Sequence, residues 1–116
     1  MKIYNMERRS GKTELLIQKC INSNFEYPII VLDNSRKRNI LCRISAITGK
    51  TTLKNTVFTI NEWFNFTNRG NDINKILIDD IEYMLPIIIN RAFGAECEIA
   101  TVSLPIDADF NNSNSQ

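Results

Sequence analysis

Early in the chain the sequence reads Arg8-Arg9-Ser10-Gly11-Lys12-Thr13. A short β-type segment at residues 2–5 precedes it, and residues 14–22 follow it with apolar side chains at helical spacing. This order predicts a strand, a polar loop and a helix that starts at the end of the loop.

The Gly11-Lys12-Thr13 core has the residue types that bind a phosphate group. Backbone N–H groups at a helix N-terminus attract an anion, and a glycine lets the chain pass close to it. Lys12 is then predicted to contact the β- and γ-phosphates of a nucleotide, and the Thr13 hydroxyl to coordinate Mg²⁺. The other residues of this predicted nucleotide-binding loop are Arg9, Ser10 and Glu14. The alternative interpretation is a polar loop with a solvated lysine and an ordinary helix cap.

A second motif lies late in the chain, where Ile76-Leu77-Ile78 is followed at once by Asp79-Asp80. The apolar run is typical of a buried parallel strand, which places the two carboxylates at its carboxyl end. Ligands of parallel sheets bind at that edge. Asp79 is therefore the predicted carboxylate for Mg²⁺, which it would hold directly or through water.

Strand-like and helix-like segments alternate along the chain. The expected strands are residues 2–5, 29–32, 56–60, 76–78 and 97–104, and the expected helices are residues 14–22, 36–46 and 81–93, with a further short helix capped by Asn61. This alternation predicts an α/β three-layer sandwich with a mostly parallel sheet of about five strands. Residues 1–106 are the predicted nucleotide-binding domain, and residues 107–116 are a predicted polar tail without regular structure.

Composition excludes several classes of function. The sequence has no histidine, which rules out histidine-dependent zinc sites, catalytic triads and imidazole acid-base chemistry. No apolar run is long enough for a membrane span and no secretory leader is recognisable, so we expect a cytoplasmic protein. Cys20, Cys42 and Cys97 are odd in number and set among apolar neighbours, as expected of reduced core thiols.

Charge is unevenly distributed, although the net charge is only +1. Residues 1–54 hold most of the lysines and arginines, and residues 55–116 hold most of the carboxylates. An early phosphate-binding loop and late metal-binding carboxylates explain the asymmetry, and nucleic acid is a second candidate reason. The basic run Arg36-Lys37-Arg38 is the candidate contact for nucleic acid, against the alternative of a solvated first helical turn.

The loop resembles the variant Walker A motif of phage terminase large-subunit ATPases and related helicase-like motors, which have a RecA-like P-loop NTPase core. In that variant an arginine three residues before the glycine often replaces the early glycine of the standard pattern. Arg8 stands at this position, and Met6 stands where the standard glycine would be. Residues 76–80 are similar to the Walker B strand of the same motors, and Thr101-Val102-Ser103 is similar to their coupling motif.

The resemblance implies a role for each matching residue. The implied catalytic residues are Lys12, Asp80 and Arg8, and the implied γ-phosphate sensors are Thr101 and Ser103. Asp80 stands where the motors usually have the glutamate that orients the attacking water, and its side chain is one methylene shorter. Glu82 is a reserve candidate for that role.

The implied function is a small Mg²⁺-dependent ATPase that binds ATP and acts with DNA or within a larger assembly, such as a homo-oligomer. The motor families complete their sites with an arginine from a neighbouring lobe or subunit, for which Arg91 or an arginine of residues 36–38 is the candidate. The alternative is a catalytically weak P-loop module that docks to a host or phage machine as a regulator or inhibitor. The small size of the chain favours this alternative.

Residues 10–16 are also similar to the phosphate loop of cellular-type thymidine kinases, which share the helicase-like core. Those enzymes carry a zinc-binding lid with paired cysteines and a C-terminal nucleoside-holding loop. Neither pattern is recognisable in this sequence, so the resemblance to the motors is preferred.

Overall fold

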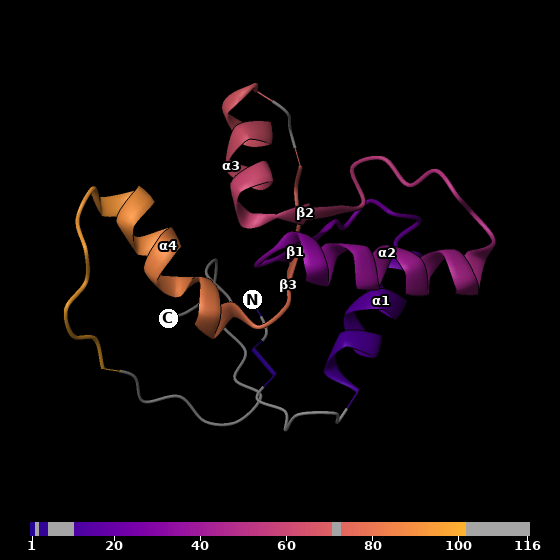
Figure 1. The fold of residues 1–116 in the computed structure, drawn as a ribbon, viewed down its shortest axis with the longest axis horizontal. Helices are drawn as coiled ribbons and strands as arrows, with labels where there is room; N and C mark the ends of the chain where they lie inside the picture. The colour runs from indigo at the N-terminus through magenta and orange to yellow at the C-terminus, as the bar shows by residue number, and fades with distance from the viewer. Residues whose placement is uncertain (2, 5–10, 71–72, 102–116) are drawn as a thin grey trace.

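The computed structural model of the chain describes residues 1, 3–4, 11–70 and 73–101 (Figure 1). Its elements are, in chain order, α1 (Lys12–Asn22), β1 (Ile29–Val31), α2 (Asn34–Thr48), β2 (Val57–Thr59), α3 (Ile60–Asn68), β3 (Leu77–Ile78) and α4 (Ile81–Phe93). None of the helices within the described ranges combines the length and the apolar character that a membrane crossing requires.

The sheet is parallel throughout and has the strand order β2-β1-β3. The central strand β1 pairs with both neighbours, with Ile29 opposite Val57 on one side and Leu77 on the other. All three β1 side chains are buried, because helices cover the sheet on both faces. This explains the unbroken apolar run in the sequence. The predicted α/β class and the parallel sheet are confirmed.

Two apolar clusters flank the sheet, because successive strand side chains point to opposite faces. Ile29 and Val31 pack with α1 and α2, whereas Ile30 packs with α3 and α4 on the other side (Figure 1). The first cluster also contains Ile17, Cys20, Ile40, Ile44 and Val57, and the second also contains Phe58, Ile60 and Met84. The described part of the chain is therefore a sandwich of helices, sheet and helices.

The described sheet has three strands rather than about five. The final strand expected at residues 97–104 is wrong for residues 97–101, which are all exposed and lie in no helix or strand. Residues that favour strands, such as Ile99 and Thr101, do not suffice, because a strand also needs a neighbour for its N–H and C=O groups. Residues 3–4 of the expected first strand also lie in no strand. The remaining residues of these two predictions, and the predicted tail at 107–116, fall outside the described residues.

Capping residues mark the N-terminus of α2 and the C-terminus of α4. Asp33 caps α2, and its side chain accepts a hydrogen bond from the Arg36 N–H at 2.9 Å. Gly94 ends α4 in the left-handed conformation, at the predicted position. Pro86 does not break α4, although a proline inside a helix removes one backbone hydrogen bond.

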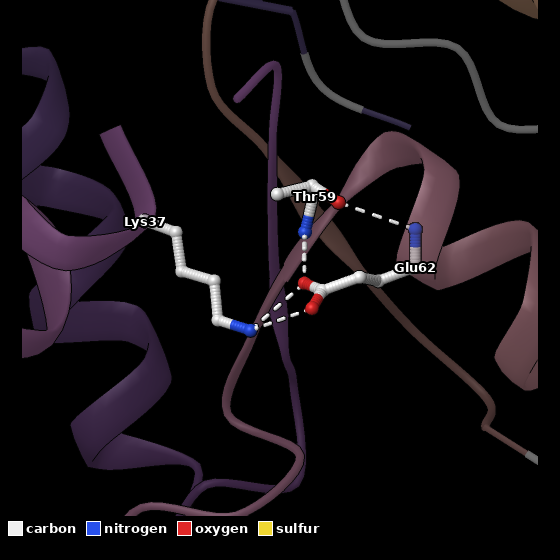
Figure 2. A network of polar contacts seen from close by, with 3 residues as sticks. All are labelled: Lys37, Thr59 and Glu62. Carbon is white, nitrogen blue, oxygen red and sulfur yellow. Dashed lines mark hydrogen bonds and ion pairs between the residues drawn. The ribbon is translucent and has the colours of Figure 1, made fainter. Parts of the chain in front are cut away.

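The cap of α3 is Thr59, so the expectation that Asn61 caps this helix is wrong. The Thr59 hydroxyl accepts from the Glu62 N–H at 3.2 Å, and the Glu62 carboxylate accepts from the Thr59 N–H at 2.9 Å (Figure 2). This reciprocal capping box satisfies two N–H groups at once. A cap at Asn61 would have Phe64 in the reciprocal position, where no side-chain acceptor exists.

Lys37 connects this cap to α2. Its Nζ lies 2.8 and 3.0 Å from the two carboxylate oxygens of Glu62 (Figure 2). The hydrogen bond from Lys37 is the main reason why the pKa of Glu62 lies below its usual value. The contact ties the first turn of α2 to the first turn of α3, so Lys37 serves the fold.

The cysteines follow the expectation only in part. Cys20 is buried in the first apolar cluster, and this burial raises the pKa of its thiol to about 11. Cys42 and Cys97 are exposed, so the prediction of core thiols is wrong for both. Cys42 has an apolar neighbour in Leu41, but its own side chain lies on the exposed face of α2.

We expect Thr59→Ala to lower the free energy of unfolding by about 1 kcal/mol, because the Glu62 N–H loses its acceptor at a helix N-terminus. Chemical denaturation followed by circular dichroism measures this change. Asn61→Ala is the matched control and should change the free energy by less than about 0.5 kcal/mol, since Asn61 is exposed and does not cap the helix. Equal losses in the two variants would contradict the assignment of the cap.

Candidate functional site

The N-terminus of α1 meets the carboxyl end of β3. Lys12 and Thr13 are the first residues of α1, and Asp79 and Asp80 directly follow β3. The Lys12 ammonium donates a hydrogen bond to the Asp80 carboxylate, and the Thr13 hydroxyl donates to Asp79 Oδ2 at 3.3 Å. The two sequence motifs therefore lie in direct contact.

The sheet and the first apolar cluster place these residues. The Asp79 N–H donates to the Ile30 carbonyl oxygen at 3.1 Å, which continues the bonding between β3 and β1 beyond the strand. α1 is anchored over the same strands by Ile17 and Cys20, both fully buried. The separation between the helix N-terminus and the carboxylates is thus set by core packing.

Gly11 gives α1 an N-terminus without a side-chain cap of its own. Its φ of 88° lies in the left-handed region, which residues with a Cβ enter only at a cost. No atom lies within 4 Å of the place that a Cβ would occupy, so the backbone angle rather than crowding favours glycine here. The N–H groups of a helix's first turn have no intrahelical acceptor, which makes them available to an anion.

Asp79 is a buried carboxylate with incomplete charge compensation. Asp79 is only 6% exposed. Burial and the charge of Asp80 raise the pKa of the Asp79 carboxyl, against the opposing effects of the Thr13 hydrogen bond and the charges of Lys12 and Arg36. A cation bound beside such a buried carboxylate stabilises its ionised form.

Asp80 holds Lys12. It is the N-cap residue of α4 in the left-handed conformation, with φ 54° and ψ 53°, but its side chain does not cap that helix. The carboxylate instead accepts from Lys12, and this hydrogen bond raises the pKa of the lysine. A phosphate group that reached Lys12 would compete with Asp80 for the same ammonium.

The oxygens of Thr13 and Asp79 suit Mg²⁺. This ion takes oxygen ligands at about 2.1 Å in octahedral geometry, so adjacent ligand oxygens lie about 3 Å apart. The Thr13 Oγ1 to Asp79 Oδ2 distance is 3.3 Å. The described residues contain no cluster of three or more metal-binding His, Cys, Asp or Glu side chains. An ion at this pair would complete its shell with phosphate oxygens and water, as Mg²⁺ commonly does.

Two cavities open beside the place where the α1 N-terminus meets the carboxyl end of β3. The first has a volume of about 320 Å³ and is lined by Gly11, Lys12, Thr13, Glu14 and Arg43. The second, of about 450 Å³, lies between Thr13, Asp79 and Asp80 on one side and α2 on the other. The cavities share Thr13 and Arg43 and are therefore adjacent. Both volumes match the range of about 300–1,000 Å³ that is usual for small-molecule sites.

Most of the α2 side of the second cavity was not predicted from the sequence, where Arg36 was a candidate only as part of the basic run 36–38 and for a site in a neighbouring lobe or subunit. The lining residues contributed by α2 are Ser35, Arg36, Asn39, Ile40 and Arg43. Arg36, Asn39 and Arg43 recur at intervals of three and four, which is the spacing of one helical face. This polar stripe is the signal in the sequence that could have identified them.

The remaining predicted site residues lie in different places. Glu14 lines the first cavity and forms an ion pair with Arg43 at 2.5 Å. Glu82 is exposed in the first turn of α4, and its charge contributes to the raised pKa of Lys12. Thr101 is exposed, belongs to no helix or strand and lines neither cavity. Arg8, Arg9, Ser10 and Ser103 lie outside the described residues.

The three residues of the basic run 36–38 lie in different surroundings. Arg36 lines the second cavity, Lys37 pairs with Glu62, and Arg38 is exposed. Arg91 lies over the Phe64 ring at 4.6 Å and lines neither cavity. Contact with nucleic acid through the basic run stays a prediction.

The site has to be interpreted from its own residues. No protein-family model, curated protein or solved structure matches the chain. The arrangement of Lys12, Thr13, Asp79 and Asp80 is therefore the basis for assigning a function.

We expect Asp79→Asn to raise the melting temperature in the absence of nucleotide and divalent ions. Because the pKa of Asp79 is raised in the folded state, the ionised carboxyl at pH 7 destabilises the fold, and stability recovers as the pH falls through that raised pKa. Asparagine removes the charge and keeps an oxygen that can accept from Thr13.

Thermal unfolding in EDTA at pH 7 measures the effect of Asp79→Asn. The difference from the wild type should shrink at a pH below the ordinary carboxyl pKa, where Asp79 is protonated in both folded and unfolded states. A variant that melts below the wild type at pH 7 would show that the charge of Asp79 is already well compensated.

Proposed function

We propose that this chain binds the polyphosphate of ATP together with Mg²⁺ at the N-terminus of α1. The observation that carries the proposal is the contact of Lys12 and Thr13 with Asp80 and Asp79 at one edge of a parallel sheet. A glycine-led helix N-terminus, a lysine, a hydroxyl and a buried carboxylate are the groups that a Mg²⁺-polyphosphate requires. A RecA-like P-loop core, related to phage terminase and helicase motors, is part of this proposal.

Each residue has a distinct role in binding. The first-turn N–H groups of α1 and the Lys12 ammonium bind the phosphate oxygens. The Thr13 hydroxyl and the Asp79 carboxylate hold the ion, which neutralises charge on the β- and γ-phosphates. Binding then replaces the Lys12–Asp80 contact with a contact between Lys12 and phosphate, and frees the Asp80 carboxylate.

Hydrolysis of the bound ATP is the proposed reaction. Asp80 lines the second cavity next to the predicted metal ligands, where its released carboxylate can accept a hydrogen bond from an attacking water. The Lys12–Asp80 contact also favours a second candidate function, which is nucleotide binding without turnover by a module that acts on another protein. In that case Asp80 serves mainly to hold Lys12.

Calorimetric titration with Mg²⁺ and a non-hydrolysable ATP analogue tests binding. We expect Lys12→Ala to weaken the affinity about 10- to 100-fold, because a charged hydrogen bond contributes about 1.5–3 kcal/mol. Lys19→Ala is the matched control, since Lys19 is an exposed lysine in the last turn of the same helix. A wild type without Mg²⁺-dependent binding, or two variants of equal affinity, would refute the proposal.

Asp80→Asn separates hydrolysis from simple binding. We expect the variant to bind the ATP analogue up to about fivefold more tightly, since Lys12 is released from an ion pair that contributes about 1 kcal/mol or less. Phosphate release should fall in the same variant if Asp80 orients the water. Phosphate release by the wild type that is no faster than by Lys12→Ala would leave only the binding function.

A further inference from the structure

The N-terminus of α4 lacks the side-chain cap that its sequence offers. Asp80 is the N-cap residue, and aspartate is among the residues that cap helices best. Its side chain accepts no hydrogen bond from the first turn of α4, and its backbone is left-handed, with φ 54° and ψ 53°. A residue that caps a helix with its side chain normally has an extended backbone instead.

The helices α2 and α3 begin in the usual way and serve as an internal comparison. Asp33 has φ −144° and ψ 173°, and its side chain accepts from the N–H three residues later at 2.9 Å. Thr59 has φ −72° and ψ 161°, and its hydroxyl accepts from the equivalent N–H at 3.2 Å. Within the described residues, the helices without a side-chain cap are α1 and α4, whose N-termini lie at the contact between Lys12 and Asp80.

Lys12 accounts for the difference between Asp80 and Asp33. The Lys12 ammonium donates to Oδ1 of Asp80, and the two side chains are 28% and 17% exposed. The carboxylate that could cap α4 is therefore engaged by a lysine of another helix. A left-handed backbone is costly for a residue with a Cβ and persists where the surroundings require it.

We propose that nucleotide binding transfers the Asp80 carboxylate from Lys12 to the N-terminus of α4, so that the first turn of α4 is capped only when the site is occupied. The inference rests on the proposed nucleotide site and adds a conformational change to it. It concerns binding and does not depend on turnover.

Electrostatics favours this transfer. A phosphate group that binds Lys12 removes the partner of Asp80 and places a second anion beside it. The N-terminus of α4 offers the N–H groups of its first turn and the positive end of the helix dipole. A carboxylate has two oxygens, so one can accept from α4 while the other stays available to a water in the second cavity.

The first turn of α4 can rearrange without disturbing the core. Ile81 is only half-buried, Glu82 and Tyr83 are exposed, and the first fully buried residue of the helix is Met84. The Arg36 guanidinium lies over the Tyr83 ring at 5.9 Å from its centre, which is a weak contact at an exposed position. The change at Asp80 is therefore a local one.

Amide hydrogen exchange measured by nuclear magnetic resonance tests the inference. We expect Mg²⁺ with a non-hydrolysable ATP analogue to slow exchange of the Glu82 and Tyr83 amides about fivefold, the factor that corresponds to a helix cap of about 1 kcal/mol. Lys12→Ala should slow the same amides by a similar factor without nucleotide, because Asp80 then loses its competing partner. Lys19→Ala is the matched control and should exchange as the wild type does, since Lys19 is exposed at the other end of α1.

A second variant separates capping from the loss of the Lys12 charge. Adding Asp80→Ala to Lys12→Ala removes the cap, so the slower exchange should disappear. Slow exchange that persists in the double variant, or exchange in Lys12→Ala at the wild-type rate, would overturn the inference. If Lys12→Ala is unfolded by thermal melting, Lys12→Met, which keeps most of the side-chain length, takes its place.

The outcomes also separate this inference from the proposed function. Nucleotide that binds in calorimetry without slowing these amides would overturn the transfer and leave the nucleotide site in place. A wild type that binds no nucleotide would overturn both, even if the amides of Lys12→Ala are protected.

Discussion

The pairing of β3 with β1 is the constraint on which the site depends. It buries Asp79 at the end of a strand and fixes its backbone through the hydrogen bond to the Ile30 carbonyl oxygen. The same β1 strand carries Ile29 and Val31, which pack with α1 and α2. One strand thus sets the relative positions of the α1 N-terminus, the carboxylates and the polar face of α2. A change in this register would separate all three.

Positive and negative side chains are paired around the contact between the α1 N-terminus and the end of β3. Such pairs suit a site at which a cationic side chain can exchange its carboxylate for a phosphate group. Three cations near the cavities each contact a carboxylate: Lys12 with Asp80, Arg36 with Asp33, and Arg43 with Glu14. These pairs are partly exposed, so each contributes little to stability and can be rearranged by a phosphate at modest cost. Asp79 differs, because it is buried and its pKa is raised. Its charge opposes folding, and a cation bound beside it would offset this effect.

Features that depend on neighbouring residues could be predicted from the sequence. The cap at Asp33, the end of α4 at Gly94 and the buried run at Ile29–Val31 are examples, since each follows from local backbone chemistry or from side-chain periodicity. The two motifs could be expected at one edge of the sheet because parallel strands share that edge.

Features that depend on packing could not be predicted. The sequence order does not determine which face of α2 turns toward β3, so Arg43 was not expected beside Thr13 and Asp79. An arginine of residues 36–38 was expected at such a site only from a neighbouring lobe or subunit, whereas Arg36 lines the cavity within the same chain. It also does not show that Asp80 would contact Lys12. The strand expected at residues 97–104 is wrong for residues 97–101 for the same reason, because strand-forming residues carry no information about a pairing partner. Binding of a nucleotide and a metal ion at the end of β3 can be tested by a nuclear magnetic resonance titration in which Mn²⁺ replaces Mg²⁺, because the paramagnetic ion broadens the amide signals near it. We expect Mn²⁺ to broaden the signals of Thr13, Asp79 and their neighbours when an ATP analogue is present, and to do so much less in Asp79→Asn. Broadening elsewhere, or broadening that does not depend on nucleotide and Asp79, would contradict a nucleotide and metal site at the end of β3.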